Sequence, residues 1–272
     1  MKQISGVAVL GIILGFGLFF LAIITNTSNY LMFFSFSSFL MVIGGTLAAS
    51  MISFRGTYVL KAFKDLVDVI IPQNINPQTL YKDVALLIEW AKAVQRGDLV
   101  QLEKEIEKSN ISDPFLSYAT KLVVSGYPSE ELRPMMTDAI ETRYERNMVQ
   151  SHILKTMASY APAFGMIGTL VGLIIMLDNL GADPDQIGKG MALALLTTLY
   201  GVLAGQLVFR PGAEKTKEKQ QIVRYRDYMI MEGLILLNER ESAVSVQDRL
   251  NSFLDPKYHF DIISQRERRD YR

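Results

Sequence analysis

The sequence predicts an all-α membrane protein with four transmembrane helices in two hairpins and a helical cytoplasmic domain. Three observations lead to this class. Four charge-free runs are each long enough to cross a bilayer, Lys and Arg are concentrated between and after the hairpins, and apolar residues elsewhere recur at helical spacing. The 272 residues are 49 % hydrophobic and 21 % charged. A mean hydropathy of +0.18 with this much charge means that apolar and charged residues occupy separate segments.

The first hairpin is expected over residues 1–54. No charged residue lies between Lys2 and Arg55. About 20 apolar residues cross the hydrocarbon core, so the run has room for two spans, at about 4–24 and 31–54, with a polar Thr-Asn-Thr-Ser-Asn break between them. A cleaved signal peptide is the rival interpretation of the first span. The length of the run and the span that directly follows it favour a helix that stays in the membrane.

The second hairpin is expected over residues 154–210, with spans at about 156–177 and 189–209. The turn between these spans contains Asp but no Lys or Arg before Lys189. No Asp, Glu, Lys, Arg or His lies inside any of the four charge-free runs. Because a proton or cation carrier normally needs an intramembrane ionisable residue, ion conduction would require a carboxylate from another chain. The sequence therefore predicts a partner.

Orientation follows from the distribution of basic residues. Of 28 Lys and Arg, 13 lie in residues 55–155 and 13 lie from Arg210 onward. Basic residues accumulate on the cytoplasmic side, so the loop domain at 55–153, the tail at 211–272 and both termini are expected in the cytoplasm.

The cytoplasmic segments show helical periodicity without a strand pattern. Prolines at 72, 77, 114 and 128 mark breaks, because the residue before a proline avoids helical geometry. A helix is expected to continue from Glu130 into the third span, and another to leave the fourth span and reach about Ser242. The Arg-rich end at 265–272 is expected to be a frayed tail, with contact to anionic membrane lipid as the weaker alternative.

Composition excludes several functional classes. The 28 Lys and Arg balance 28 Asp and Glu, whereas a nucleic-acid binder needs a basic excess, so no nucleic-acid partner is expected. With no Cys and 2 His, the chain lacks the residues of a thiolate nucleophile or a zinc site. No phosphate-binding loop or intramembrane acid–base pair is present, so we expect no enzyme, no catalytic residue and no resident metal.

The third and fourth spans are rich in small and polar residues. The pairs Gly168/Gly172 and Gly201/Gly205 have the spacing that lets helix backbones approach closely. The first two spans are almost purely apolar and aromatic. The sequence therefore predicts an inner layer made by the third and fourth spans and an outer layer made by the other two.

Threonines in this inner layer have two possible roles. The hydroxyls of Thr169, Thr197 and Thr198 can each bond to a carbonyl one turn back, the usual fate of a membrane threonine. Alternatively, with helix carbonyls, they can supply oxygen atoms to a hard cation such as sodium. Pro162 adds to the second reading because a proline frees a carbonyl four residues earlier, near Ala158.

Two sequence blocks carry a resemblance to a known family. Pro-Ala-Phe-Gly-Met-Ile-Gly-Thr-Leu-Val-Gly-Leu (162–173) and Ala-Leu-Leu-Thr-Thr-Leu-Tyr-Gly (194–201) resemble the flagellar motor stator A subunit, the MotA/PomA family, and its sodium-driven branch most closely. The likeness extends to the four-span layout, to Val-Ile-Gly-Gly-Thr (42–46) in the second span and to the basic tail.

The resemblance implies a motor in the bacterial inner membrane. In this family five A subunits, a homo-pentamer, surround two B subunits whose spans carry the ion-binding Asp and whose other parts anchor to peptidoglycan. Ion flux is thought to turn the A ring, whose cytoplasmic domain drives the switch-complex protein of the rotor. The transported cation, expected here to be sodium, is the only small partner implied.

The resemblance also implies roles for single residues. By matching position, conformational roles go to Pro162 and Pro211. The ion pathway is assigned to the side chains of Thr169, Thr198 and Thr197 and to the backbone of Gly165. Contacts with the rotor are assigned to three charged residues of the cytoplasmic domain, Arg96, Glu103 and Lys104.

The chain departs from the family pattern at two positions. Relatives often carry a second basic residue where this chain has Gln95, which leaves the rotor contact to be shared with Lys104, and a solvated helix face is the alternative reading of these charges. Some sodium-type relatives carry an Asp where this chain has Ser35. Proton-type relatives usually have a small apolar residue at Thr169.

Three functional alternatives stay open. An ExbB/TolQ-like energiser typically has three spans, so the extra span and Pro211 favour the flagellar branch. A proton-driven stator of the same family is the second alternative, because hydroxyl oxygens can host more than one ion. A self-sufficient channel would need a pore carboxylate or filter motif that the sequence lacks.

Overall fold

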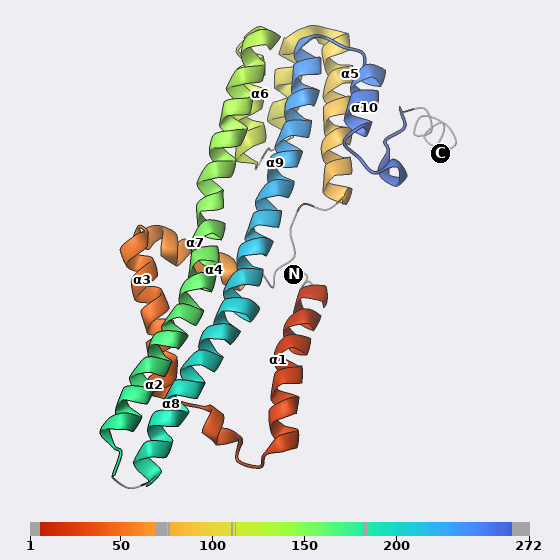
Figure 1. Ribbon diagram of the computed structural model, residues 1–272. Coiled ribbons are helices and arrows are strands. Elements are labelled where there is room, and N and C mark those ends of the chain that lie inside the picture. Colours follow the sequence, from red (N-terminus) through yellow and green to blue (C-terminus); the bar gives the residue numbers. More distant parts are fainter. Residues whose placement is uncertain are drawn as a thin grey trace. The chain divides into compact units, whose positions relative to one another are not determined.

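The computed structural model describes residues 6–68, 75, 77–109, 111, 113–181 and 184–262 (Figure 1), and within these ranges every regular element is helical. The all-α prediction is confirmed. The helices are α1 (Gly6–Asn26), η1 (Tyr30–Phe33), α2 (Phe36–Phe39), η2 (Leu40–Gly44), α3 (Gly45–Ser53), α4 (Gly56–Asp68), α5 (Pro77–Lys108), α6 (Pro114–Val124), α7 (Ser129–Asp178), α8 (Pro184–Leu203), η3 (Ala204–Phe209), α9 (Arg210–Asn238), α10 (Ala243–Asn251) and η4 (Pro256–Tyr258).

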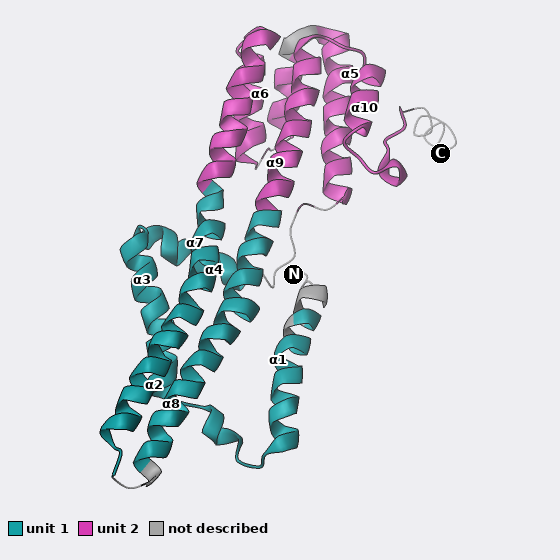
Figure 2. Cartoon of the chain, in the orientation of Figure 1, with its two compact units in different colours: residues 1–72, 147–218 teal, residues 73–146, 219–272 magenta. Residues whose placement is uncertain are grey.

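The chain divides into two compact units, each discontinuous in sequence (Figure 2). Unit 1 comprises residues 1–72 and 147–218, and unit 2 comprises residues 73–146 and 219–272. The two long helices α7 and α9 supply residues to both units. Unit 1 thus contains most of both expected membrane hairpins, and unit 2 contains most of the expected cytoplasmic loop domain together with the tail.

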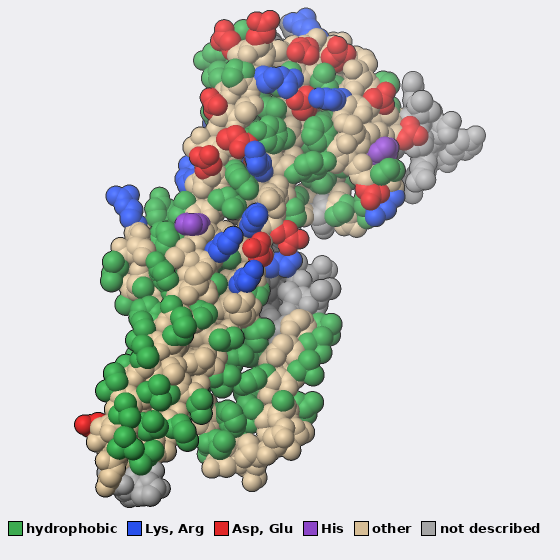
Figure 3. Space-filling model, viewed as in Figure 1, with side chains coloured by type: hydrophobic (Ala, Val, Ile, Leu, Met, Phe, Trp, Pro, Cys, Tyr) green, Lys and Arg blue, Asp and Glu red, His purple; other side chains and the backbone are tan. Residues whose placement is uncertain are grey.

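Three helical stretches of the described chain are long and apolar enough to cross a membrane. They are Tyr30–Ser53, Ser129–Asp178 and Gln186–Asn238. The first predicted span corresponds to α1, which has 21 residues. Its part Ile13–Asn26 is an apolar helix that is shorter than these three stretches. On the face drawn in Figure 3, hydrophobic side chains gather over α2, α7 and α8 of unit 1, whereas charged side chains gather over unit 2 and over the start of α9.

The second span, expected at about 31–54, corresponds to the helical stretch Tyr30–Ser53. Within it the regular α-helix starts only at Phe36, because Phe34 and Ser35 have extended backbones. The Ser35 side chain accepts a hydrogen bond from the Ser38 N–H and caps the N-terminus of α2. Ser and Thr side chains compete with helix formation in this way, so the local chemistry shortens the helix.

The irregular backbone at this break is bonded to α8. The Tyr200 hydroxyl donates to the Phe33 carbonyl at 2.5 Å and accepts from the Ser35 N–H at 2.9 Å. Non-helical backbone at membrane depth must find its partners inside the protein. One phenol therefore satisfies both free backbone groups and connects the first hairpin to the second.

The expected helix continuations are confirmed. α7 runs unbroken for 50 residues from Ser129 to Asp178, and the fourth span passes through η3 into α9, which ends at Asn238. Proline-marked starts are also confirmed: α5 begins at Pro77, and Asp113 caps α6 with Pro114 in its first turn. The predicted breaks at Pro72 and the Arg-rich tail at 265–272 lie outside the described residues.

Each unit has its own hydrophobic core. In unit 2 the core surrounds Trp90, which is 2 % exposed, and joins α5, α6, α7, α9 and α10. In unit 1 a smaller core joins α4 with α7 and α9 around residues such as Val59, Leu154 and Ala213.

Candidate functional site

The helices α7 and α8 touch almost backbone to backbone. A β-carbon placed on Gly168 would lie 2.5 Å from the Thr197 hydroxyl oxygen, and one on Gly172 would lie 2.6 Å from the Gly190 carbonyl oxygen. One on Gly201 would lie 2.6 Å from the Ala161 carbonyl oxygen. Real side chains do not approach this closely, so only glycine permits the observed separation. The predicted close approach at the glycine pairs of these spans is confirmed.

Gly165 completes the same interface and lies beside the threonines. A β-carbon on Gly165 would be 2.9 Å from the Thr197 carbonyl oxygen and 3.2 Å from the Thr198 α-carbon. In contrast, Gly11 of α1 has nothing within 4 Å of its β position. The tight stripe is therefore a property of the α7–α8 pair and not of glycine pairs in general.

Thr197 follows the ordinary pattern for a membrane threonine. Its side chain is fully buried, and its hydroxyl lies 2.9 Å from the Leu193 carbonyl and 3.0 Å from the Ala194 carbonyl. Both acceptors lie one turn back on α8. The hydroxyl is thus satisfied within its own helix, as the first of the two readings expects.

Thr169 and Thr198 face each other across the interface. Their hydroxyl oxygens are 2.6 Å apart, and the Thr169 hydroxyl also lies 3.2 Å from the carbonyl oxygens of Gly165 and Ala194. Thr198 lies 3.4 Å from the Ala194 carbonyl. Two hydroxyls and two carbonyls from two helices therefore converge on one small polar site in an apolar layer.

Hydroxyls from Thr169, Thr197 and Thr198 all lie within 3.4 Å of the Ala194 carbonyl oxygen. Thr197 and Thr169 each have a further acceptor, the carbonyls of Leu193 and Gly165, so they do not depend on this oxygen alone. Each hydroxyl has one donor and two lone pairs. The lone pairs of the paired Thr169 and Thr198 hydroxyls are the acceptors that this site offers to a ligand that carries positive charge or donates a hydrogen bond.

The two expected conformational prolines both lie next to η3, one on the packed helix α7 and one in the chain directly after η3. Gly205, in the π-helical η3, packs against Pro162: a β-carbon there would lie 3.1 Å from the ring Cδ and 2.8 Å from the Ala158 carbonyl oxygen. Pro211 follows directly after η3, in the first turn of α9. A proline cannot donate the backbone bond of a regular helix, and π segments are one way in which a helix absorbs such a defect.

The three residues expected to contact a rotor lie on α5 of unit 2. Arg96, Glu103 and Lys104 all have exposed side chains. Because α5 is one continuous helix, seven residues of rise separate Arg96 from Glu103 by roughly 10 Å along its axis. They form an exposed charged stretch, and each is free to meet another macromolecule.

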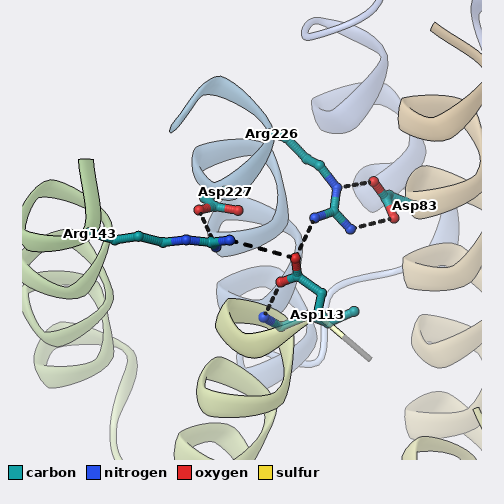
Figure 4. A network of polar contacts seen from close by, with 6 residues as sticks. Asp83, Asp113, Arg143, Arg226 and Asp227 are labelled. Carbon is teal, nitrogen blue, oxygen red and sulfur yellow. Dashed lines mark hydrogen bonds and ion pairs between the residues drawn. The ribbon is translucent and has the colours of Figure 1, made fainter. Parts of the chain in front are cut away.

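A second polar cluster, in unit 2, is not evident from the sequence. Arg226 on α9 donates to both carboxylate oxygens of Asp83 on α5, at 2.6 and 3.0 Å, and to Asp113 at the start of α6, at 3.0 Å (Figure 4). Arg143 on α7 donates to Asp227 at 2.8 Å. These ion pairs connect four helices around one point.

Asp227 is the unusual member of this cluster. Its side chain is 1 % exposed, and burial raises its pKa to about 7, although the positive charge of Arg143 opposes the shift. Among the residues that the structure describes, its Oδ1 atom has no hydrogen-bond partner. Burial alone would lower the pKa of Arg226, but bonding and charge from Asp83 and then Asp113 outweigh it and raise the pKa. Three carboxyls share two guanidinium groups, so the cluster has a surplus negative charge when Asp227 is ionised.

Sequence reasoning missed several of these positions. Tyr200, Ala194 and Gly190 were not singled out, and neither was the cluster around Arg226. A tyrosine in an otherwise apolar span is a usable signal, because a buried phenol normally has a hydrogen-bond partner. Nothing in the local sequence indicates which arginine meets which carboxylate.

Comparison with known proteins assigns a family. Residues 107–226 match the model of the MotA/TolQ/ExbB proton channel family. The uncharacterized protein YtxD of Bacillus subtilis is 34 % identical over 93 % of this chain and 92 % of its own length. Motility protein A of Borreliella burgdorferi is 31 % identical over 92 % and 94 %, and chemotaxis protein PomA of Vibrio alginolyticus is 31 % identical over 90 % and 94 %. The chain belongs to this family.

The fold agrees with this assignment. The solved structure of C. jejuni MotAB matches with a TM-score of 0.83 and 25 % identity, over 93 % of this chain and 96 % of the matched chain. The flagellar MotAB stator complex from Bacillus subtilis matches with a TM-score of 0.81 and 26 % identity, over 92 % and 96 %. Within the family, the chain thus has the fold of a MotA-type stator protein, and both MotA and PomA relatives resemble it to a similar degree.

Proposed function

We propose that this chain is the A subunit of a flagellar stator, a membrane motor that uses cation flux, with sodium as the cation, to turn the flagellar rotor. The observation that carries the proposal is the pairing of the Thr169 and Thr198 hydroxyls at 2.6 Å beside the Ala194 carbonyl. The similarity to MotAB structures over more than nine-tenths of the chain supports the motor class.

Sodium is favoured by the chemistry of the site. Hard cations in proteins take oxygen ligands, including backbone carbonyls, and the two hydroxyls with the carbonyls of Gly165 and Ala194 are such a set. All four oxygens are uncharged. A sodium ion bound here would therefore need a carboxylate from another chain to balance its charge.

A partner of the MotB type would supply that carboxylate. The charge-free runs of this chain contain no ionisable group, and the matched stator structures are described as MotAB complexes. We propose five copies of this chain around two copies of the partner, with α7 and α8 lining the centre. α1 would serve as a fourth span, since its 21 residues are roughly 32 Å long, enough to cross a hydrocarbon core.

The energy source would be the ion gradient. A cation crossing 100 mV releases about 2.3 kcal/mol, to which the concentration gradient adds. When the ion neutralises the partner's carboxylate beside Thr169 and Thr198, the preferred contact between ring and partner changes and the ring steps. Pro162 and Pro211 would accommodate the change, and Arg96, with Glu103 and Lys104, would pass torque to the rotor.

Rotation speed in a strain without stators tests the proposal. The chain and its partner are expressed together, and external sodium is varied at fixed pH and voltage. We expect speed to rise with sodium, Thr169→Ala to lose most of the response, and Thr169→Ser, which keeps the hydroxyl, to retain it. A speed independent of sodium would assign the motor to protons. Failure to rotate, despite partner binding, would favour an ExbB/TolQ-like energiser.

A further inference from the structure

The helix α4 begins three residues after α3 ends and has two distinct faces. One face is buried in unit 1: Val59 and Ala62 are fully buried, and Phe63 and Leu66 pack against the same core. Leu66 fits against Gly212 of α9, where a β-carbon would collide with it. These positions recur at helical spacing, so the buried face holds α4 against the membrane helices of unit 1.

The opposite face is exposed and combines apolar and basic residues. Leu60 is 65 % exposed and Val67 is 69 % exposed, seven residues apart on one line of the helix. Lys61 and Lys64 lie between them and are also exposed. Large apolar side chains that face outward beside lysines are the pattern of a helix lying in a membrane interface.

The surroundings of α4 fit the edge of a bilayer. Met51 and Ile52, in the last turn of α3, are 53 % and 87 % exposed, so apolar side chains cover the surface up to the point where α4 begins. At the same level the hydroxyls of Ser53 and Tyr160 lie 3.0 Å apart. Tyrosines are enriched where a membrane meets water.

We propose that the exposed face of α4, defined by Leu60, Lys61, Lys64 and Val67, binds the anionic headgroups of the leaflet in which α3 ends. Leu60 and Val67 would enter the boundary between headgroups and acyl chains, and the lysine stems would lie along them with their ammonium groups at the lipid phosphates. The proposal rests only on the membrane-embedded part of the proposed function.

Charge explains why the occupant is an anionic lipid. Lys61, Lys64 and the exposed Arg55 bring three positive charges to this end of α3. Asp65, one helical turn after Lys61, is half-buried and already has an interaction partner, so the three exposed basic residues still leave a net positive charge here. Each basic residue near an anionic membrane surface contributes about 1 kcal/mol, or about fivefold in lipid binding.

The first experiment measures where α4 lies. Because the chain has no Cys, Leu60→Cys and Val67→Cys each give one site for an environment-sensitive fluorophore. The full chain with its partner is reconstituted in vesicles of phosphatidylcholine with 30 % phosphatidylglycerol. We expect quenching by nitroxide-labelled acyl chains and little quenching by aqueous iodide. Val244→Cys on α10, where the native side chain is 54 % exposed, is the matched control and should respond to iodide.

The second experiment tests the choice of lipid. At the Leu60→Cys label, nitroxide-labelled phosphatidylglycerol should quench several-fold better than nitroxide-labelled phosphatidylcholine at equal amounts. Adding Lys64→Gln should reduce this preference about fivefold. Lys121→Gln, which removes an exposed lysine of unit 2, should leave it unchanged.

Three results would overturn the proposal. Strong iodide quenching at Leu60 and Val67 would mean that α4 faces water, and quenching by neither reagent would mean that another protein surface covers it. Equal quenching by the two lipids would remove the anionic preference. None of these readouts depends on rotation or sodium, so a failure of the motor proposal would leave this test intact.

Discussion

Replacing Asp227 by Asn should change how the stability of unit 2 depends on pH. The folded state raises the pKa of Asp227 from 3.8 to about 7, chiefly through burial. Between these values the folded protein binds a proton that the unfolded protein releases. Stability therefore falls as pH rises from about 4 to about 7 and changes no further above that range. An Asn has no proton to release, so the variant should lack this fall.

The expected size follows from the pKa. Between pH 5 and pH 7 the Asp227 carboxyl is protonated in the folded state and ionised in the unfolded state. Over each of these two pH units the free energy of unfolding changes by 1.36 kcal/mol. The stability difference between Asp227→Asn and the original chain should thus grow by about 3 kcal/mol from pH 5 to pH 8, in favour of the variant. Other titrating groups are common to both proteins and cancel.

The single tryptophan provides the assay. Trp90 is buried in the core of unit 2, so its fluorescence reports the unfolding of this unit in the full-length protein during denaturant titration in detergent. Asp138→Asn, which changes an exposed carboxyl on α7, is the matched control and should follow the original pH curve. A difference that stays constant from pH 5 to pH 8 would refute the argument that burial holds a proton on Asp227.

Three other substitutions test the packing and bonding. Gly168→Ala should lower stability by about 1–3 kcal/mol because its methyl group would collide with the Thr197 side chain, whereas Gly188→Ala, which has open space, should be neutral or stabilising. Tyr200→Phe should destabilise by about 1–3 kcal/mol, since two backbone groups at the break before α2 lose their partner. Arg226→Met should be the most damaging, at about 3–5 kcal/mol, because the largely buried Asp83 carboxylate loses its guanidinium partner and Asp113 keeps only the more distant Arg143. Thermal unfolding in detergent measures all three, and changes below about 0.5 kcal/mol would contradict the assigned contacts.

Local chemistry made much of the fold predictable. Asp113 followed by Pro114 is a helix start by capping and by fixed backbone geometry, and α6 begins there. Pro128 marks a break in the same way, and α7 begins at the next residue. The long charge-free runs predicted membrane helices because a membrane span requires only about 20 consecutive, mainly apolar residues. In each instance the signal lies within a few residues of the feature that it predicts.

Features set by distant contacts were not predictable. The break at Phe34 and Ser35 depends on a phenol 165 residues away, on Tyr200. The pairing of Arg226 with Asp83 spans 143 residues, and nothing near either residue specifies it. The π-helical segments η2 and η3 likewise have no local sequence rule of comparable strength. Contacts of this kind require the three-dimensional arrangement of helices that are far apart in sequence.

The candidate ion site lies between these two situations. The sequence identified Thr169, Thr197 and Thr198 and left open whether each bonds to its own helix or serves a ligand. Hydrogen bonding distinguishes them: Thr197 lies against its own helix, whereas Thr169 and Thr198 meet across the interface. Which hydroxyl faces which helix depends on the rotation of α8 about its axis, and spacing along one chain does not fix that rotation.

The glycines that bring α7 and α8 together also determine the geometry of the polar site. The 2.6 Å separation of the Thr169 and Thr198 hydroxyls exists only because Gly165 lets the Thr198 backbone approach, at a position where any side chain would meet the Thr197 carbonyl. If the helices moved apart by the thickness of one methyl group, the two hydroxyls could no longer act on the same ion. If the site binds the cation as proposed, packing and ion selectivity depend on the same few atoms. Variants designed to change the cation would then have to alter the glycines together with the threonines.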